Sequence, residues 1–112
     1  MTERMKYYGR TRKSLRELGI PVHRMGYKVL CEAIPRYAVN DRQMLSKELY
    51  PALAETFGFT NGCAVERSVR SSIASAWGHR DPAVWDSYFP NSHRAPTNLI
   101  FIATLANRMK ES

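Results

Sequence analysis

The sequence predicts an all-α domain, a compact bundle of about six helices that contains a helix-turn-helix, and three observations support this prediction. Apolar residues recur at three- and four-residue spacing along most of the chain, which is the period of an amphipathic helix. No segment has the sustained alternation of a strand between turn signals. With 112 residues, 44% apolar side chains, 6 Gly and 6 Pro, the chain has the size of one domain and little room for linkers.

The first 14 residues are expected to form a flexible basic arm, because they are rich in Lys and Arg and have no apolar period. Arms of this kind follow DNA phosphates or enter the minor groove, so Arg10 and Arg12 are candidate contacts. Residues 15–112 form the predicted helical domain. Its first helix is expected to begin at Ser14, whose capping-box partner is Glu17, and to stop shortly afterwards.

Capping residues and helix breakers locate the other helices. Asn40 followed by Gln43 is a capping signature, and Thr97 or Asn98 is expected to cap the last helix. Pro35 lies inside an apolar pattern and should kink or end its helix early, because proline lacks a backbone donor. The helices are expected over residues 27–37, 40–48, 51–57, 63–77, 83–89 and 98–110.

The helices predicted over 51–57 and 63–77 have the form of a helix-turn-helix, joined by the four-residue turn Phe59–Gly62. The second of them divides into two faces. Its apolar stripe consists of Val65, Val69, Ile73, Ala76 and Trp77. Its outward face consists of Glu66, Arg67, Arg70, Ser71 and Ala74.

The outward face has side chains that can read base edges. Arginine has a planar fork that matches guanine O6 and N7, and glutamate can accept a hydrogen bond from cytosine N4. The other interpretation is a solvated face on which Glu66 merely pairs with Arg70 at i,i+4. The candidate DNA-binding residues are Asn61, Glu66, Arg67, Arg70 and Ser71, together with Arg10 and Arg12.

Charge and hydropathy narrow the classes of function. A formal net charge of +7 and a pI near 9.8 favour a polyanionic partner, because neutralised phosphates release condensed counterions. The most apolar run, Leu99–Ala106, is far shorter than the roughly 20 residues of a membrane span. The N-terminus lacks the apolar run of a secretory signal. We therefore expect a cytoplasmic protein with no membrane association.

Cysteine and histidine spacing argues against metal, disulfide and catalytic chemistry. Cys31 and Cys63 are far apart in the sequence and have no CxxC spacing, which favours a reduced protein. The three histidines are scattered, so no metal site is expected. The pattern offers no nucleophile with a base and an orienting group, so we expect no enzymatic activity and no cofactor.

Several short motifs recur in an order that resembles a known family. They are Leu18–His23, Gly26–Tyr27, Leu30, Ala33–Ile34, Leu49–Pro51, Val65–Arg67, Arg70, Ala76–Trp77, Pro96–Asn98 and Phe101–Ala103. Together they resemble the C-terminal DNA-binding domain of stage 0 sporulation protein A, the response regulator that initiates endospore formation. The similarity covers about residues 15 to 110. It implies a six-helix domain that binds short GC-containing promoter boxes, commonly as tandem copies, and activates or represses transcription.

Within this resemblance, Glu66, Arg67 and Arg70 match recognition-helix positions that face DNA. Two positions depart from the family, which usually has Arg in place of Ala64 and His in place of Ser71. The loss of one bidentate Arg–guanine contact costs about 1–3 kcal/mol of discrimination, so preference for the family's own box is expected to weaken. The family also has a receiver domain, which residues 1–14 are too short to form. The chain is therefore either an excised domain or, as Met1 and the basic segment favour, a stand-alone relative without control by phosphorylation.

The last helix has apolar residues on more than one side, which leaves two interpretations. It is either deeply buried, which we expect, or its second face contacts another copy of the chain. The first functional hypothesis is a sequence-specific transcription regulator that binds double-stranded DNA and self-associates through this helix, with RNA polymerase as a further candidate partner. The alternative is a non-catalytic protein-interaction module that modulates a sporulation regulator or the transcription machinery.

Overall fold

A computed structural model describes residues 3–111 and contains helices and no strand over that range. Six α-helices and one short π-helical segment follow one another within these residues. They are α1 (Glu3–Glu17), α2 (Met25–Val39), η1 (Leu45–Leu49), α3 (Tyr50–Phe57), α4 (Gly62–Gly78), α5 (Pro82–Tyr88) and α6 (Asn98–Lys110). The prediction of an all-α bundle of about six helices is confirmed.

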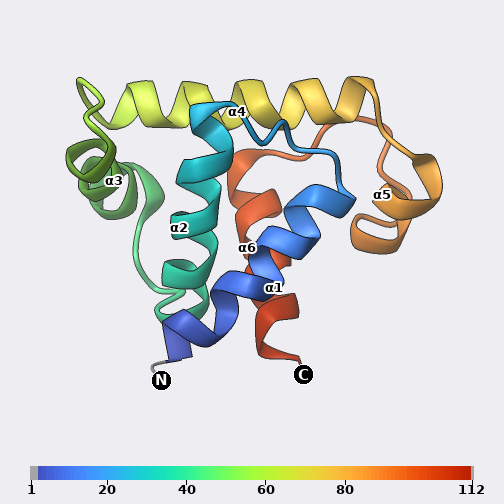
Figure 1. Cartoon of the computed structure of the whole chain (residues 1–112), viewed down its shortest axis with the longest axis horizontal. Helices are drawn as coiled ribbons and strands as arrows, with labels where there is room; N and C mark the ends of the chain where they lie inside the picture. The colour runs from blue at the N-terminus through green and yellow to red at the C-terminus, as the bar shows by residue number, and fades with distance from the viewer. Residues whose placement is uncertain (1–2, 112) are drawn as a thin grey trace.

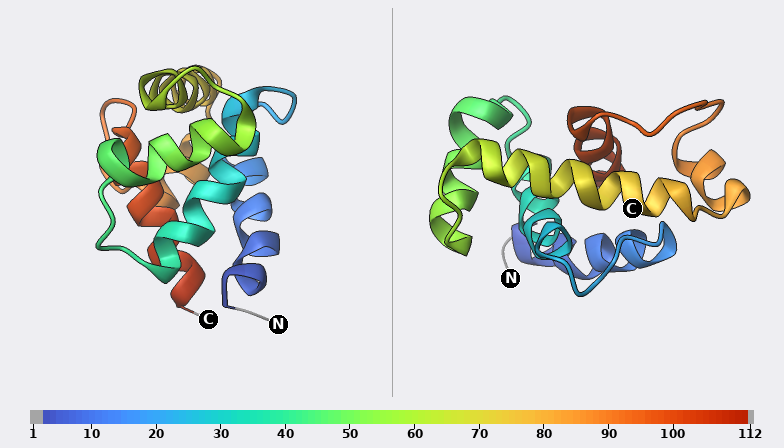
Figure 2. Two further views of the ribbon diagram at one scale, coloured as in Figure 1. Left: turned by 90° about the vertical axis from the view of Figure 1, so that its left-hand side faces the viewer. Right: turned by 90° about the horizontal axis from the view of Figure 1, so that it is seen from above.

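Helix α4 lies across one side of the molecule, and α2 and α6 run from it toward the opposite side (Figure 1). Helix α1 packs against both α2 and α6, and the chain begins and ends on that opposite side. Helices α3 and α5 lie toward the two ends of α4. The turned views show α4 as the outermost element on its side (Figure 2), so its outer surface is not covered by another helix.

The prediction of a flexible arm over residues 1–14 is wrong for the residues that the structure describes, because helix α1 includes residues 3–14. Tyr7, Thr11 and Leu15 are buried at four-residue spacing. The sequence interpretation relied on the basic side chains and missed this period, in which a tyrosine and a threonine occupy core positions. Ser14 does not begin a helix but is buried within α1, where its hydroxyl accepts a hydrogen bond from α5.

Two further boundaries differ from the prediction. Helix α2 continues past Pro35, which is buried and whose missing N–H removes only one hydrogen bond within the helix. Asn40 is the C-cap of α2 rather than the start of the next helix. The capping interaction lies four residues later, where the Glu48 carboxylate accepts from the Met44 backbone N–H at 3.1 Å, just before η1.

The predicted ends of α3, α4 and α6 are confirmed. Pro51 lies in the first turn of α3, and Gly58 ends that helix with a φ of 76°, a left-handed conformation that suits glycine. The Asn61 side chain caps α4 by accepting from the Ala64 N–H at 3.0 Å, and Thr97 caps α6. Helices α3 and α4 therefore meet at the expected turn, an arrangement consistent with a helix-turn-helix.

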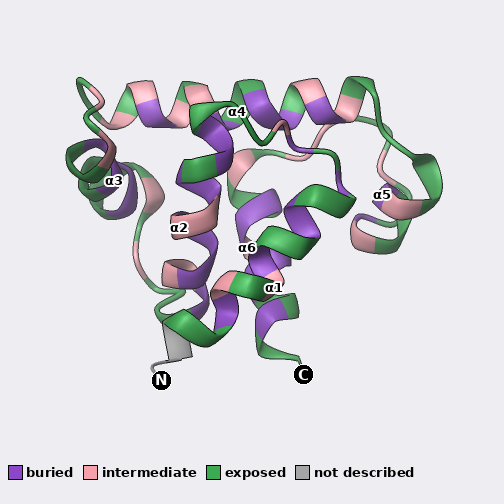
Figure 3. Cartoon of the chain, viewed as in Figure 1, coloured by how far each residue is buried: buried purple, intermediate pink, exposed green. Residues whose placement is uncertain are grey.

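Helix α6 passes through the core, where the buried faces of α2, α4 and α6 meet (Figure 3). Phe101, Ile102 and Leu105 are fully buried, and each such side chain contributes about 1.5–3 kcal/mol of transfer free energy. Deep burial of this helix is therefore confirmed for most of its apolar residues. Leu99 and Ile100, in its first turn, are instead exposed.

An aromatic cluster fixes α5 to the far end of α4. The Trp85 ring packs edge-on against Trp77, with ring centroids 5.5 Å apart, and its indole N–H donates to the Leu18 carbonyl at 3.0 Å. Trp77 belongs to the predicted apolar stripe of α4 but is only half-buried. This cluster fixes the end of α4 that is remote from α3.

Candidate nucleic-acid interface

Helix α4 has one buried face and one exposed face, as the sequence predicts. Val65, Val69 and Ile73 are buried against the neighbouring helices. The exposed residues of the outer side include Arg67, Arg70, Ser71 and Ala74. Two cationic side chains and two short ones therefore face solvent along the middle of the outermost helix.

Glu66 and Arg70 form an ion pair on this face, with an N–O distance of 3.2 Å. The Arg70 side chain is 62% exposed and that of Glu66 is 39% exposed, so water screens the pair. Exposed pairs at i,i+4 contribute about 0.3–0.5 kcal/mol. The solvated-face interpretation is therefore correct for the unbound protein. The pair is weak enough for a nucleic-acid partner to displace either side chain.

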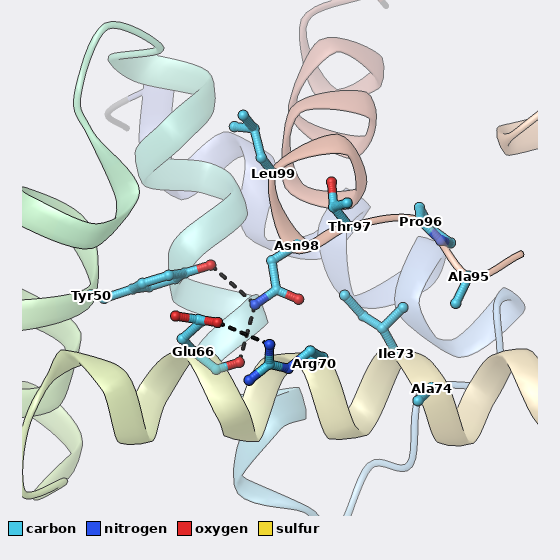
Figure 4. A pocket seen from close by; sticks show the side chains of 10 residues that line it. All are labelled: Tyr50, Glu66, Arg70, Ile73, Ala74, Ala95, Pro96, Thr97, Asn98 and Leu99. Carbon is cyan, nitrogen blue, oxygen red and sulfur yellow. Dashed lines mark hydrogen bonds and ion pairs between the residues drawn. The ribbon is translucent and has the colours of Figure 1, made fainter.

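Asn98, in the first turn of α6, connects three elements at this face (Figure 4). Its side-chain N–H group donates to the Tyr50 hydroxyl at 3.2 Å and to the Glu66 backbone carbonyl at 3.1 Å. Burial raises the pKa of the Tyr50 phenol, and the hydrogen bond from Asn98 opposes that rise. Asn98 thus fixes the first turns of α3 and α6 against the part of α4 that holds the ion pair.

An open groove of about 460 Å³ separates the outer face of α4 from the chain segment before α6. Glu66 and Arg70 line it on one side, and Pro96 and Leu99 line it on the other (Figure 4). The Glu66–Arg70 ion pair thus lies along this groove.

The opposite flank of α4 is packed against the start of α2. A Cβ atom on Gly26 would lie 2.0 Å from the Ser72 hydroxyl and 2.6 Å from the Ser68 carbonyl, so only glycine permits this approach. His23 and Arg24, which precede α2, are exposed. Seen from above α4, the loop between α1 and α2 lies along one edge of the helix and the segment before α6 along the other (Figure 2).

The amino-acid sequence matches a family model. Residues 11–109 of the chain match the family described as "sporulation initiation factor Spo0A C terminal". The chain belongs to this family. The resemblance drawn from the sequence motifs is thus confirmed, and the chain is a DNA-binding effector domain of the sporulation response-regulator type.

Ala64 and Ser71, at which a departure from the family pattern is expected, both lie on α4. Ala64 is in the first turn and half-buried, with its backbone N–H bonded to the Asn61 side chain. Ser71 is exposed near the middle of the helix. Both side chains are short.

The structure does not bring Arg10 or Arg12 to this face. The Arg10 guanidinium donates to the Met109 carbonyl at 2.8 Å, at the C-terminal end of α6. Asn98, at the other end of α6, bonds to α4, and its separation of eleven positions from Met109 corresponds to about 16 Å of helix. Arg12 is exposed on α1. Within the candidate site, the residues that lie together are therefore Asn61, Glu66, Arg67, Arg70 and Ser71.

Sequence reasoning did not assign a site role to Asn98 or Gly26. From the sequence, Asn98 is predicted only to cap the last helix and to belong to a family motif. A cap needs one polar residue, whereas Thr97 and Asn98 are two in succession at the start of this helix. Gly26 is a comparable signal of a special position, because it lies in the first turn of a helix that alanine would stabilise more.

Other chemistry has little support in the described residues. No three His, Cys, Asp or Glu side chains among them are grouped so that they could hold a metal ion. Cys31 and Cys63 are both free thiols. No helix within residues 3–111 is both long and apolar enough to cross a membrane.

Proposed function

We propose that the chain binds double-stranded promoter DNA sequence-specifically and regulates transcription, with α4 as the helix that enters the major groove. One observation carries the proposal. Helix α4, the second helix of the predicted helix-turn-helix, has an exposed cationic face, with Arg67 and Arg70 one turn apart, on the outermost side of the molecule. An α-helix fits the major groove, where every base pair has a distinct pattern of donors and acceptors.

Each residue of the outer face has a separate role in this proposal. Arg67, which forms no ion pair within the described part of the chain, presents its guanidinium fork to a guanine. Arg70 exchanges Glu66 for a second base or a phosphate. Glu66, once released, accepts a hydrogen bond from cytosine N4. Ser71 is short and lets the helix approach the base edges closely.

Asn61 contributes through the start of α4 rather than through a base. Its side-chain oxygen is engaged with the Ala64 N–H, which fixes the first turn of the helix. We include Asn61 in the DNA-facing surface because it is exposed beside the N-terminus of α4, where recognition helices approach bases and phosphates. Arg10 is not part of this surface.

We also propose that two copies contact each other on tandem boxes through the first turn of α6. Leu99 and Ile100 are 50% and 52% exposed there, although the rest of the apolar residues of α6 are mostly buried. Adjacent exposed aliphatic side chains favour a protein partner. An Ile100→Ser variant should bind a single box normally and lose cooperative binding to two adjacent boxes.

Selection of bound sequences from a random duplex pool tests the proposed function. The wild-type chain should enrich one short motif, and its affinity should fall steeply with salt, because phosphate contacts release counterions. Arg70→Ala should lose the preference at one base pair of that motif while retaining the fold. Arg42→Ala, which removes an exposed arginine in the segment that follows α2, is the matched control.

If no duplex is bound above background at low salt, DNA binding by this chain is wrong. The alternative would then be the protein-interaction module. If the wild-type chain binds duplexes without enriching a motif, DNA binding remains and sequence-specific reading through α4 is wrong.

A further inference from the structure

Two pairs of exposed apolar side chains lie near α4. Leu99 and Ile100, in the first turn of α6, are 50% and 52% exposed. Val22, in the loop between α1 and α2, is 51% exposed, and Met25, the first residue of α2, is 39% exposed. We call Leu99 with Ile100 the α6 pair and Val22 with Met25 the loop pair.

Contacts with α4 place the two pairs on opposite flanks of that helix. Leu99 lines a groove together with Glu66 (Figure 4). On the other flank, Gly26, which follows Met25, packs against Ser68. Ser68 comes two residues after Glu66, which is a rotation of about 200° around a helix with 3.6 residues per turn.

Both pairs border the proposed DNA-facing surface. Seen from above α4, the loop between α1 and α2 follows one edge of the helix and the segment before α6 follows the other (Figure 2). The exposed Arg67 is about 100° around α4 from Glu66, midway between the two flanks. When α4 lies along a major groove, the two flanks are therefore turned toward the two directions of the duplex.

Two copies bound to motifs in the same orientation meet through unlike surfaces. Such copies are related by a translation along the duplex and a rotation about it, so the α6 flank of one copy faces the α2 flank of the next. This contact is heterologous, because each surface meets a different surface of its neighbour. Copies on inverted motifs are related by a two-fold axis instead, which brings identical flanks together.

The size of the molecule and of the two pairs limits where this contact can form. The chain extends 24 Å along its shortest axis, the direction that separates the two edges of α4 in Figure 2. One duplex turn is about 34 Å long, so two copies fit on motifs one turn apart without overlap. Four partly exposed side chains bury far less than the roughly 1,200–2,000 Å² of a stable interface. The contact therefore depends on DNA, which holds the two copies at a high effective concentration.

We propose that the α6 pair of one DNA-bound copy packs head to tail against the loop pair of the next copy. The inference rests on the proposed function and deepens it, since it names the surface that the first turn of α6 contacts. It predicts cooperative binding to two motifs in the same orientation one duplex turn apart. It also predicts no cooperativity on inverted motifs at that spacing, and a monomer in the absence of DNA.

Single substitutions in each pair test the contact. Val22→Ser and Ile100→Ser should each bind one selected motif as tightly as the wild-type chain. Each should lose the wild-type cooperativity on two motifs, which we expect at about 5–150-fold, the usual range of coupling between sites. Val39→Ser is the matched control, because Val39 is 50% exposed at the end of α2 remote from α4, and it should retain this cooperativity.

An equimolar mixture of the two defective variants tests the head-to-tail arrangement. A Val22→Ser copy still has an intact α6 pair, and an Ile100→Ser copy still has an intact loop pair. One order of these two copies on the duplex rebuilds the complete contact, so cooperative binding should return in the mixture although neither variant shows it alone.

Several results would overturn the inference. Full cooperativity of Val22→Ser would show that the loop pair does not receive the α6 pair. A mixture without cooperativity would show that the two substitutions do not lie on opposite sides of one contact. Cooperativity confined to inverted motifs, or absent from the wild-type chain, would contradict the head-to-tail contact as well. In each case base reading by α4 would stand if Arg70→Ala still altered the preferred motif, whereas a chain that binds no duplex would contradict both proposals.

Discussion

The two flanks of α4 are constructed in opposite ways. On the α6 side, polar groups are paired, since Asn98 bonds to the Glu66 carbonyl and the Glu66 carboxylate pairs with Arg70. On the α2 side, Gly26 packs against Ser68 and Ser72 of α4. The exposed side chains of Arg24 and Lys28, near the start of α2, form no ion pair within the described residues. One flank determines how the helix and its reading side chains are oriented. The other supplies close packing and unneutralised charge.

The largest effect is expected on the closely packed flank. Gly26→Ala places a Cβ 2.6 Å from the Ser68 carbonyl, a backbone atom that α4 can relieve only by moving. The free energy of unfolding should fall by about 3 kcal/mol in urea titrations, the upper end of overpacking costs. Gly9→Ala is the matched control, since nothing lies within 4 Å of its Cβ, and it should stabilise by about 0.5–1 kcal/mol. Equal effects at the two glycines would show that the α2–α4 contact is not tight.

A smaller effect is expected on the hydrogen-bonded flank. Asn98→Ala removes two hydrogen bonds and should lower the unfolding free energy by about 1–2 kcal/mol. Because Asn98 fixes the part of α4 that contains Glu66, DNA affinity should fall as well. Tyr50→Phe removes only one of these bonds and should have about half the effect on stability. If Asn98→Ala destabilises the protein but leaves its DNA affinity unchanged, Asn98 does not position α4 for DNA binding.

A pH effect should arise from the same flank. The pKa of Tyr50 is raised in the folded state by burial, so the folded protein binds that proton more tightly than the unfolded chain. Stability should therefore be complete below the ordinary tyrosine pKa of 10.0 and decrease as pH rises above it. Thermal unfolding between pH 8 and 11 measures this, and Tyr50→Phe should lose less stability over that interval than wild type. If the stability of the two proteins falls equally between pH 8 and 11, groups other than Tyr50 cause the loss of stability at alkaline pH.

The smallest effect is expected for the ion pair itself. Glu66→Gln should change stability by no more than about 0.5 kcal/mol, because the pair is exposed. Its effect on DNA binding distinguishes two roles. A gain in affinity for all duplexes would mean that Glu66 mainly restrains Arg70, whereas a loss confined to one C·G position would mean that Glu66 reads that base.

The sequence predicted the α3–α4 region well because its signals are local. Pro51, Gly58 and Asn61 each act through their own backbone or that of a near neighbour, so caps and breakers determine the turn without knowledge of the rest of the fold. The apolar and polar faces of α4 follow in the same way from a regular period.

The N-terminal segment was predicted incorrectly because its core is made by tertiary contacts. Tyr7 and Thr11 read as polar in isolation, and they become core residues only when α2 and α6 cover them. Arg10 likewise resembles a free cation until the end of α6 supplies the Met109 carbonyl. The hydrogen bonds of Asn98 join residues 32 and 48 positions away, a distance over which no sequence period gives information.

The most direct test of base reading by α4 is the affinity of Arg67→Ala and Arg70→Ala for every single base-pair change in the selected motif. The account predicts that each variant loses about 1–3 kcal/mol of discrimination at its own position and retains discrimination elsewhere. If both variants lose affinity uniformly, with the ranking of base-pair changes preserved, these arginines bind phosphates only. The claim that the exposed face of α4 reads sequence would then be contradicted.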